Sequence, residues 1–205
     1  MSINTYGNLK AQVAYFLNRT DLAAYIPDLI VLGEQRIYYG ADDPWQSQPL
    51  RVPAMQTRTT GSITASAIAF PSDYLEPIRI AASSGGQTWP LAYVSPEMFD
   101  QSSAAVPTTY TVLNNTIETA GTGSASYTLD YYGKFDTLSS DEDTNWLLTN
   151  APGVYLYGSL LESTAFLDLD PGRMAQWHSV YKAAISSLNR ATKYQASGLA
   201  ARVVR

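Results

Sequence analysis

The side chains that could carry catalysis are few, and their spacing does not favour it. The chain has one histidine, His178, and no cysteine. One imidazole cannot form a multi-histidine metal site, and the lack of cysteine removes thiolate ligands, disulfides and thiol nucleophiles. A serine–histidine–aspartate triad would have to use His178, but the sequence has no Gly-x-Ser-x-Gly elbow, and Gly158-Ser159 falls inside a predicted helix. We therefore expect no catalytic residues of this kind and a structural role for His178.

One acidic stretch partly resembles a calcium-binding loop. Asp141, Asp143 and Asn145 occupy its first three ligand positions, but Trp146 replaces the required glycine and Pro152 stands at position twelve. This pattern favours a solvated loop before a helix, and we expect no metal ion and no cofactor. A pair of carboxylates for glycoside hydrolysis depends on their separation in space, so a carboxylate-based hydrolase stays open as an alternative.

Aromatic residues offer a second alternative, because the chain contains 15 tyrosines. Aromatic faces on a β-domain can stack on sugars or on single-stranded bases. The candidates are Trp89, Tyr93, Tyr110 and Tyr132. Most lie in phase with apolar neighbours, which favours core and interface packing. A carbohydrate-binding β-domain is therefore kept as an alternative.

Composition points to a surface that is covered by partners. The alternative is an ordinary β-rich domain, since β-structure also favours threonine and tyrosine. The 205 residues suffice for one large or two small domains; 45% are hydrophobic and only 15% are charged, against an average of about 25%. The net charge of −5 argues against a protein that coats DNA. No basic segment followed by an apolar run begins the chain, and no apolar run approaches about 18 residues, so we expect neither a signal peptide nor a membrane span.

The elements that would position these side chains are helices at the two ends. Thr5 is placed to cap a first helix, and a second runs from Ile26 to about Tyr39, where Gly40 can end it. Gly33 costs roughly 1 kcal/mol against alanine inside a helix, so it is tolerable there if another helix packs closely. The apolar positions are Tyr6, Leu9, Val13, Phe16 and Leu17 in the first helix and Leu29, Ile30, Gly33 and Ile37 in the second.

Between about residues 54 and 134, short apolar or threonine-rich runs alternate with turn clusters, which is typical of antiparallel β-structure. Asn114-Asn115 suits a two-residue hairpin because asparagine tolerates positive φ. Ser95-Pro96-Glu97 predicts a short helical turn, capped by Ser95, that continues to about Ser103. The predicted strands are 57–60, 67–70, 78–82, 88–93, 108–113, 116–119 and 126–132.

Helix returns in the last third of the chain. Thr149 or Asn150 is placed to cap a helix over 151–167, and Asp170-Pro171 starts the last one, which Gly198 would end. The last helix carries the most regular apolar spacing of the chain, at intervals of three and four residues, which favours packing on other helices. Its helix- and subunit-packing positions are Met174, Trp177, Tyr181, Ala184 and Leu188.

The predicted fold class is therefore α+β. A helical bundle would be formed by residues 1–45 and 140–196, with an antiparallel β-sandwich or barrel-like domain, 46–139, inserted between them. Residues 197–205 would form a C-terminal tail.

Charge is distributed unevenly along this architecture. After Asp170 there are six basic residues and no acid, whereas the rest of the chain carries 18 acids and seven bases, a net of −11. A basic helix and tail can dock on an acidic partner or on phosphates, without reading a nucleic-acid sequence. The alternative is a solvated basic face whose charge suits the C-terminal end of a helix.

Four segments resemble the head-to-tail adaptor (connector, or head-completion) proteins of tailed bacteriophages. Ala151–Ser163 and Trp177–Asn189 carry most of the resemblance, and Leu22–Tyr39 and Phe70–Glu76 add to it. These motifs are short and structural, and together they touch about half of the chain. None of them is catalytic.

The resemblance implies a non-enzymatic virion protein at the head–tail junction, assembled in the host cytoplasm. It implies a ring, commonly of twelve copies, that docks on the portal protein, links it to a tail or nozzle protein, and surrounds a channel that DNA crosses without sequence-specific binding. It also implies a C-terminal extension that reaches the portal. The docking residues would then be Leu199, Arg202, Val203, Val204 and Arg205. A tail-terminator ring is a further alternative.

Overall fold

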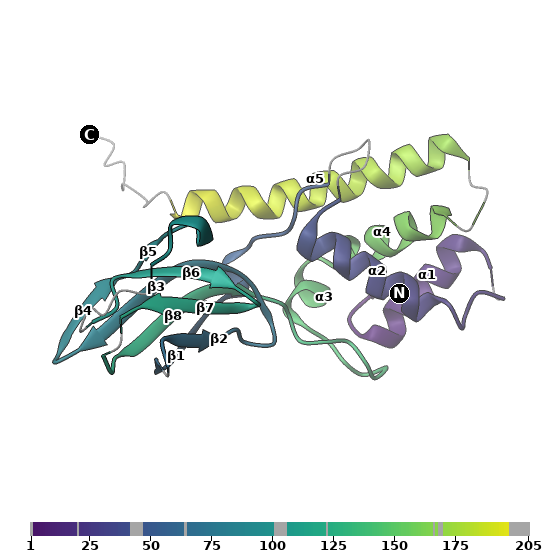
Figure 1. The fold of residues 1–205 in the computed structure, drawn as a ribbon. Helices are drawn as coiled ribbons and strands as arrows, with labels where there is room; N and C mark the ends of the chain where they lie inside the picture. Colours follow the sequence, from purple (N-terminus) through teal and green to yellow (C-terminus); the bar gives the residue numbers. More distant parts are fainter. Residues whose placement is uncertain are drawn as a thin grey trace, which may run out of the picture. The chain divides into compact units, whose positions relative to one another are not determined.

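The computed structural model describes residues 2–19, 21–41, 47–63, 65–100, 106–121, 123–165, 167 and 170–196, with side chains up to Arg190. The chain divides into two compact units, Met1–Ala54 with Phe135–Arg205 and Met55–Lys134. The first is helical and the second holds two four-stranded sheets (Figure 1). The predicted α+β class is thereby confirmed.

The helical unit is organised around one central helix, α4. This helix packs against α1, α2, α3 and α5, so it is buried on several sides. Short 3₁₀ turns precede β1 and follow α4, at Pro53–Met55 and Ser163–Ala165. The helices are α1 Tyr6–Leu17, α2 Ile26–Tyr39, α3 Trp146–Asn150, α4 Pro152–Glu162 and α5 Pro171–Ala196.

The first two helices form where the sequence predicted them. The Oγ1 of Thr5 accepts a hydrogen bond from the backbone N–H of Asn8, which caps α1, and Gly40 ends α2 with φ at 74°. The predicted inward positions of α2 are buried. A Cβ on Gly33 would lie only 2.9 Å from the backbone nitrogen of Ser159, so α2 and α4 approach through their backbones. Another helix therefore does pack closely at Gly33, which is the condition under which a glycine is tolerable there.

The predicted cap at Thr149 or Asn150 is wrong. Asn145 starts the helical segment instead, because its Oδ1 accepts a hydrogen bond of 2.9 Å from the N–H of Leu148. This begins a separate short helix, α3. The helix breaks at Ala151, with φ −146° and ψ 59°, since a residue before proline disfavours helical geometry, and α4 begins at Pro152 with no side-chain cap.

The last helix, α5, places Trp177 and Tyr181 in the core. His178 and Ile185 are buried with them, whereas Met174, Ala184 and Leu188 lie partly exposed beside this stripe. The buried positions recur at intervals of three and four residues, as expected for one face of a helix. Gly198 lies outside the described residues.

The second unit is a sandwich of two sheets. The first has the strand order β1-β8-β3-β4 and is antiparallel throughout; the second has the order β2-β7-β6-β5, with β5 parallel to β6. Their shared core contains residues from both sheets, among them Ile80 and Leu129 from the first and Ile68 and Ile117 from the second. The strands are β1 Gln56–Ser62, β2 Ala67–Ala69, β3 Tyr74–Ser84, β4 Gln87–Pro90, β5 Ala92–Tyr93, β6 Thr109–Leu113, β7 Thr116–Ala120 and β8 Ser126–Gly133.

Some local features of this unit match the prediction and others do not. Asn114 and Asn115 adopt φ of 47° and 59° between β6 and β7, as the hairpin prediction required. The single strand expected over 88–93 is wrong, because the chain changes sheet at the buried Leu91, whose N–H bonds to the carbonyl of Ile80. The turn after Ser95 is a 3₁₀ helix, Pro96–Met98, and Ser95 makes no side-chain cap.

No helix within the described segments is both long and apolar enough to cross a bilayer.

The close approach of α2 to α4 gives a stability prediction. Gly33→Ala should gain helix propensity, yet its Cβ would press on the α4 backbone, so we expect a net loss of about 1–3 kcal/mol in the free energy of unfolding. Gly153→Ala is the control, because a Cβ there meets only Tyr157 at 3.9 Å. Urea denaturation of both variants tests this; a Gly33→Ala protein as stable as the parent would contradict it.

Candidate interaction surface

The two residues considered for a catalytic triad serve helix packing. Ser159 is buried in α4, and its hydroxyl donates a hydrogen bond of 2.8 Å to the carbonyl of Tyr155. His178 is buried in α5 beside Trp177. The structure therefore gives the Ser159 hydroxyl a local partner within its own helix, as is common for serine in a helix interior.

The acidic side chains of the calcium-like pattern bind donor groups of the protein itself. The Asp143 carboxylate accepts hydrogen bonds from the N–H groups of Ser139 and Ser140 and from the Ser139 hydroxyl, and Asp141 pairs with Lys10 at 2.5 Å. Asn145 caps α3. Within the described part of the chain, no cluster of three or more acidic or histidine side chains is placed to hold a metal ion.

The carboxyl groups of Asp130 and Asp143 have lowered pKa values, which favours their ionised forms. Hydrogen bonds from Ser140 and Ser139 lower the pKa of Asp143. The hydrogen bond from Arg58, at 2.5 Å, lowers the pKa of Asp130, and Arg79 contributes from the neighbouring strand. A general acid needs the opposite shift, so these two carboxyl groups give the hydrolase alternative no support.

The aromatic candidates of the β unit do not form a flat platform. Trp89 packs against the sandwich core, and its Nε1–H donates a hydrogen bond of 2.6 Å to the Pro107 carbonyl. The rings of Tyr93 and Tyr110 meet edge to face, at an interplanar angle of 65°, and Tyr132 lies on β8 with a half-buried side chain. Sugar stacking requires an exposed face, which Trp89 does not offer.

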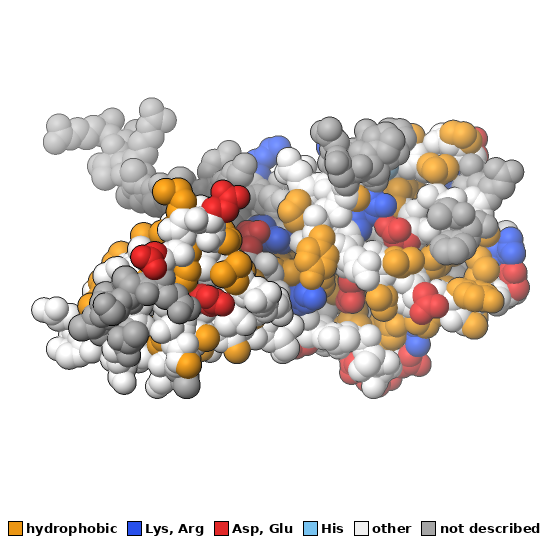
Figure 2. All heavy atoms as spheres, viewed as in Figure 1, with side chains coloured by type: hydrophobic (Ala, Val, Ile, Leu, Met, Phe, Trp, Pro, Cys, Tyr) orange, Lys and Arg blue, Asp and Glu red, His pale blue; other side chains and the backbone are white. Residues whose placement is uncertain are grey.

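The outer face of α2 carries a row of large exposed side chains. Tyr25 just before the helix, and Leu32 and Tyr39 within it, are spaced by seven residues and have exposed fractions of 61%, 36% and 62%. We call these three residues the α2 ridge. Figure 2 shows hydrophobic side chains gathered on the face of the helical unit that carries α2.

The packing of α2 dictates the direction of this ridge. Ile30, Gly33 and Ile37 face the core, so positions seven residues apart on the other side of the helix must face outward. Arg36 fixes the same helix to α4 through a half-buried ion pair of 2.6 Å with Glu162. The ridge is therefore presented by a helix that two contacts hold in one rotation.

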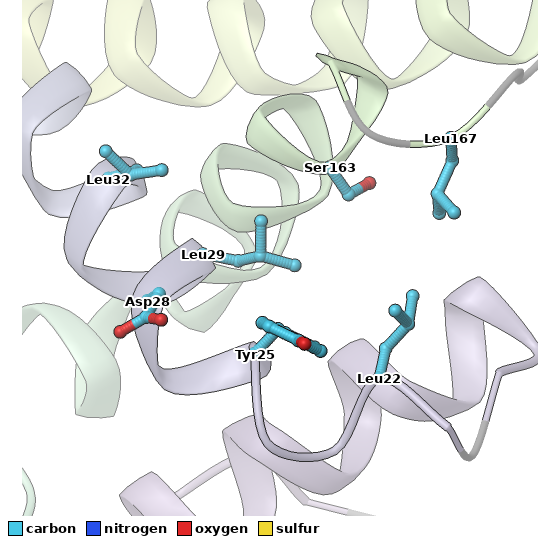
Figure 3. Close-up of a pocket in the computed structure, with 7 residues that line it drawn as sticks. All are labelled: Leu22, Tyr25, Asp28, Leu29, Leu32, Ser163 and Leu167. Carbon is cyan, nitrogen blue, oxygen red and sulfur yellow. The ribbon is translucent and has the colours of Figure 1, made fainter.

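A groove adjoins the ridge at the start of α2. Its volume is about 480 Å³. Leu22 and Leu167 face each other across it, and the Asp28 carboxylate lies at its edge (Figure 3). The residues that line it are Leu22, Tyr25, Asp28, Leu29, Leu32, Ser163 and Leu167. The lining is mostly apolar, so the groove and the ridge together form an interaction surface that favours an apolar protein partner.

The sequence-predicted docking residues Leu199, Arg202, Val203, Val204 and Arg205 lie outside the described residues. Sequence reasoning missed the α2 ridge. Its signal was present as the seven-residue spacing of Tyr25, Leu32 and Tyr39, on the side of the helix away from the predicted buried stripe.

A family model described as SU10 adaptor protein matches residues 4–204, almost the entire chain. No curated protein matches.

The ridge should contribute little to the stability of the folded chain. Leu32→Ala should change the free energy of unfolding by less than about 1 kcal/mol because its side chain is exposed, whereas Ile30→Ala, two residues away in the core, should cost about 2–5 kcal/mol. Urea denaturation compares the two variants. Equal losses would show that Leu32 belongs to the core rather than to an interaction surface.

Proposed function

This chain belongs to the SU10 adaptor protein family, a family of phage structural proteins, and we propose that it forms a ring at the junction of head and tail. The ring docks on the portal, binds a tail or nozzle protein and surrounds part of the DNA channel. The observation that carries this proposal is the family match over residues 4–204, which includes both helical ends and the inserted sandwich.

The exposed apolar surface of the helical unit supports assembly into a larger object. Monomeric proteins rarely expose a large contiguous apolar patch, and such a patch usually marks a site that binds a partner or a ligand. The α2 ridge and its groove are such a patch, with few charged side chains. Obligate interfaces bury about 2,000 Å² or more, which a ring subunit reaches by contacts on two sides.

The charge distribution supports a channel wall to which passing DNA does not adhere. Up to Asp170 the chain carries a net charge of −11. An acidic wall repels phosphates, so DNA would pass without sticking and without sequence-specific contacts. Twelve copies is the number that the sequence resemblance implies for the ring.

The C-terminal tail is the proposed portal-docking segment. Its residues Leu199, Val203 and Val204 are apolar, Arg202 and Arg205 are basic, and none of residues 197–205 is acidic. A short segment of this composition suits an apolar pocket with an acidic rim. We propose that these residues bind the portal surface directly.

Deletion of residues 197–205 tests the docking proposal. The truncated chain should keep its melting temperature, because the core residues of α4 and α5 up to Ile185 remain, and should lose co-sedimentation with portal rings. Val203→Asp with Val204→Asp, in the full-length chain, should have the same effect through the cost of burying charge.

Ser187→Asp is the matched control, since it places a charge at an exposed position of α5 outside the tail. This variant should still bind. Unimpaired co-sedimentation of the truncated chain would refute the role of the tail.

A further inference from the structure

The helical unit has a second hollow, on the side of α4 that faces away from α2. Gly158 and Ser159 lie against Gly33 of α2, and Tyr155 donates a hydrogen bond to Glu34. Tyr157 is two residues from both Tyr155 and Ser159, and two residues correspond to about 200° of rotation around a helix. Tyr157 therefore points to the face opposite the α2 ridge.

This second hollow is formed by three helices. Its volume is about 230 Å³. The ring of Phe16 from α1 meets that of Tyr157 edge to face at 6.4 Å, and Val180 of α5 contributes an exposed apolar side chain. The residues that line this α1/α4/α5 hollow are Phe16, Tyr157, Arg173, Gln176, Trp177 and Val180.

The two faces carry opposite charge. The exposed Asp28 stands beside the α2 ridge, at the edge of the groove. Arg173 stands at the α1/α4/α5 hollow, over the ring of Trp177 at 5.7 Å, and α5 holds no acidic residue along its length. A ridge of aromatic and aliphatic side chains with an acid therefore faces one way, and an aromatic hollow with a base faces the other.

We propose that the α2 ridge of one protomer packs across the α1/α4/α5 hollow of a second copy, with Asp28 of the one near Arg173 of the other. This inference rests on the proposed ring and specifies its lateral contact. Two different patches meet, so the contact is heterologous and each protomer offers both halves. Such contacts close into rings or extend into filaments, whereas a two-fold dimer would pair one patch with itself.

Disulfide trapping tests the contact directly, because this chain contributes no native cysteine. Leu32→Cys and Val180→Cys are combined in one chain, and portal-bound protein is oxidised and separated on a non-reducing gel. Each protomer then has a thiol on each face, so we expect a ladder of dimers, trimers and larger species.

Single-cysteine variants distinguish a contact between two different faces from a contact of one face with itself. Leu32→Cys alone and Val180→Cys alone should stay monomeric on the gel, and their mixture should stop at dimers. The control is Thr149→Cys with Val180→Cys, which uses an exposed position on α3 and should give no ladder. Self-linking of Leu32→Cys alone, or no ladder from the double variant, would overturn the proposal.

A charge exchange provides an independent test. Asp28→Arg and Arg173→Asp, each alone, should weaken ring assembly about tenfold by placing like charges together. The double variant should recover assembly, because each contact again joins opposite charges. Both positions are exposed, so melting temperatures should stay at the parent value. Two weakened single variants whose combination is weaker still would contradict the pairing.

These outcomes are distinguishable from failure of the proposed function. Portal co-sedimentation and particle mass report whether a ring exists at all. If rings form on the portal but no ladder appears, the assigned faces are wrong while the adaptor function stands. If neither rings nor portal binding is found, the proposed function fails together with this inference.

Discussion

The surface of the helical unit depends on the backbone approach of α2 to α4. A Cβ on Gly33 would lie within 2.9–3.2 Å of three backbone atoms of Gly158 and Ser159, so no larger residue fits without a shift. This contact fixes the rotation of α2. Because its inner stripe is locked on α4, the side chains of Tyr25, Leu32 and Tyr39 must point outward. The outward direction of the α2 ridge therefore depends on a glycine in the core.

Buried polar contacts join α3 to α4 and α2. Asn145 caps α3 through its Oδ1, while its Nδ2 donates to the Tyr155 hydroxyl at 2.8 Å, and that hydroxyl donates to Glu34 of α2. Burial raises the pKa of Tyr155, and it raises the pKa of Tyr38 to about 12. Both phenols thus stay neutral near pH 7 and keep their hydrogen-bonding roles. One asparagine and one tyrosine connect three helices in this way.

Features that depend on nearby residues were predicted from the sequence. The choice of partner among distant segments was missed. Thr5 and Asn114-Asn115 act through their own backbone or nearest neighbours, and each was predicted. Gly33 indicated a close helix partner, but the sequence did not say that this partner is α4. The cap at Asn145 was missed because Thr149 and Asn150 offered equally good local chemistry. The sheet change at Leu91 was missed because a strand's partner depends on distant residues. The α2 ridge was overlooked since an exposed apolar row has no periodic signature distinct from a buried one. The adaptor resemblance was confirmed by the family match.

The central proposal is that this chain supplies shape and adhesive surface to a symmetric ring that assembles on the portal. The mass of the particle that it forms with its portal tests this most directly. Native mass spectrometry should find the portal mass increased by a fixed whole-number multiple of 22.4 kDa, at or near twelve copies. A chain that remains a single 22.4 kDa species beside the unchanged portal would contradict the account.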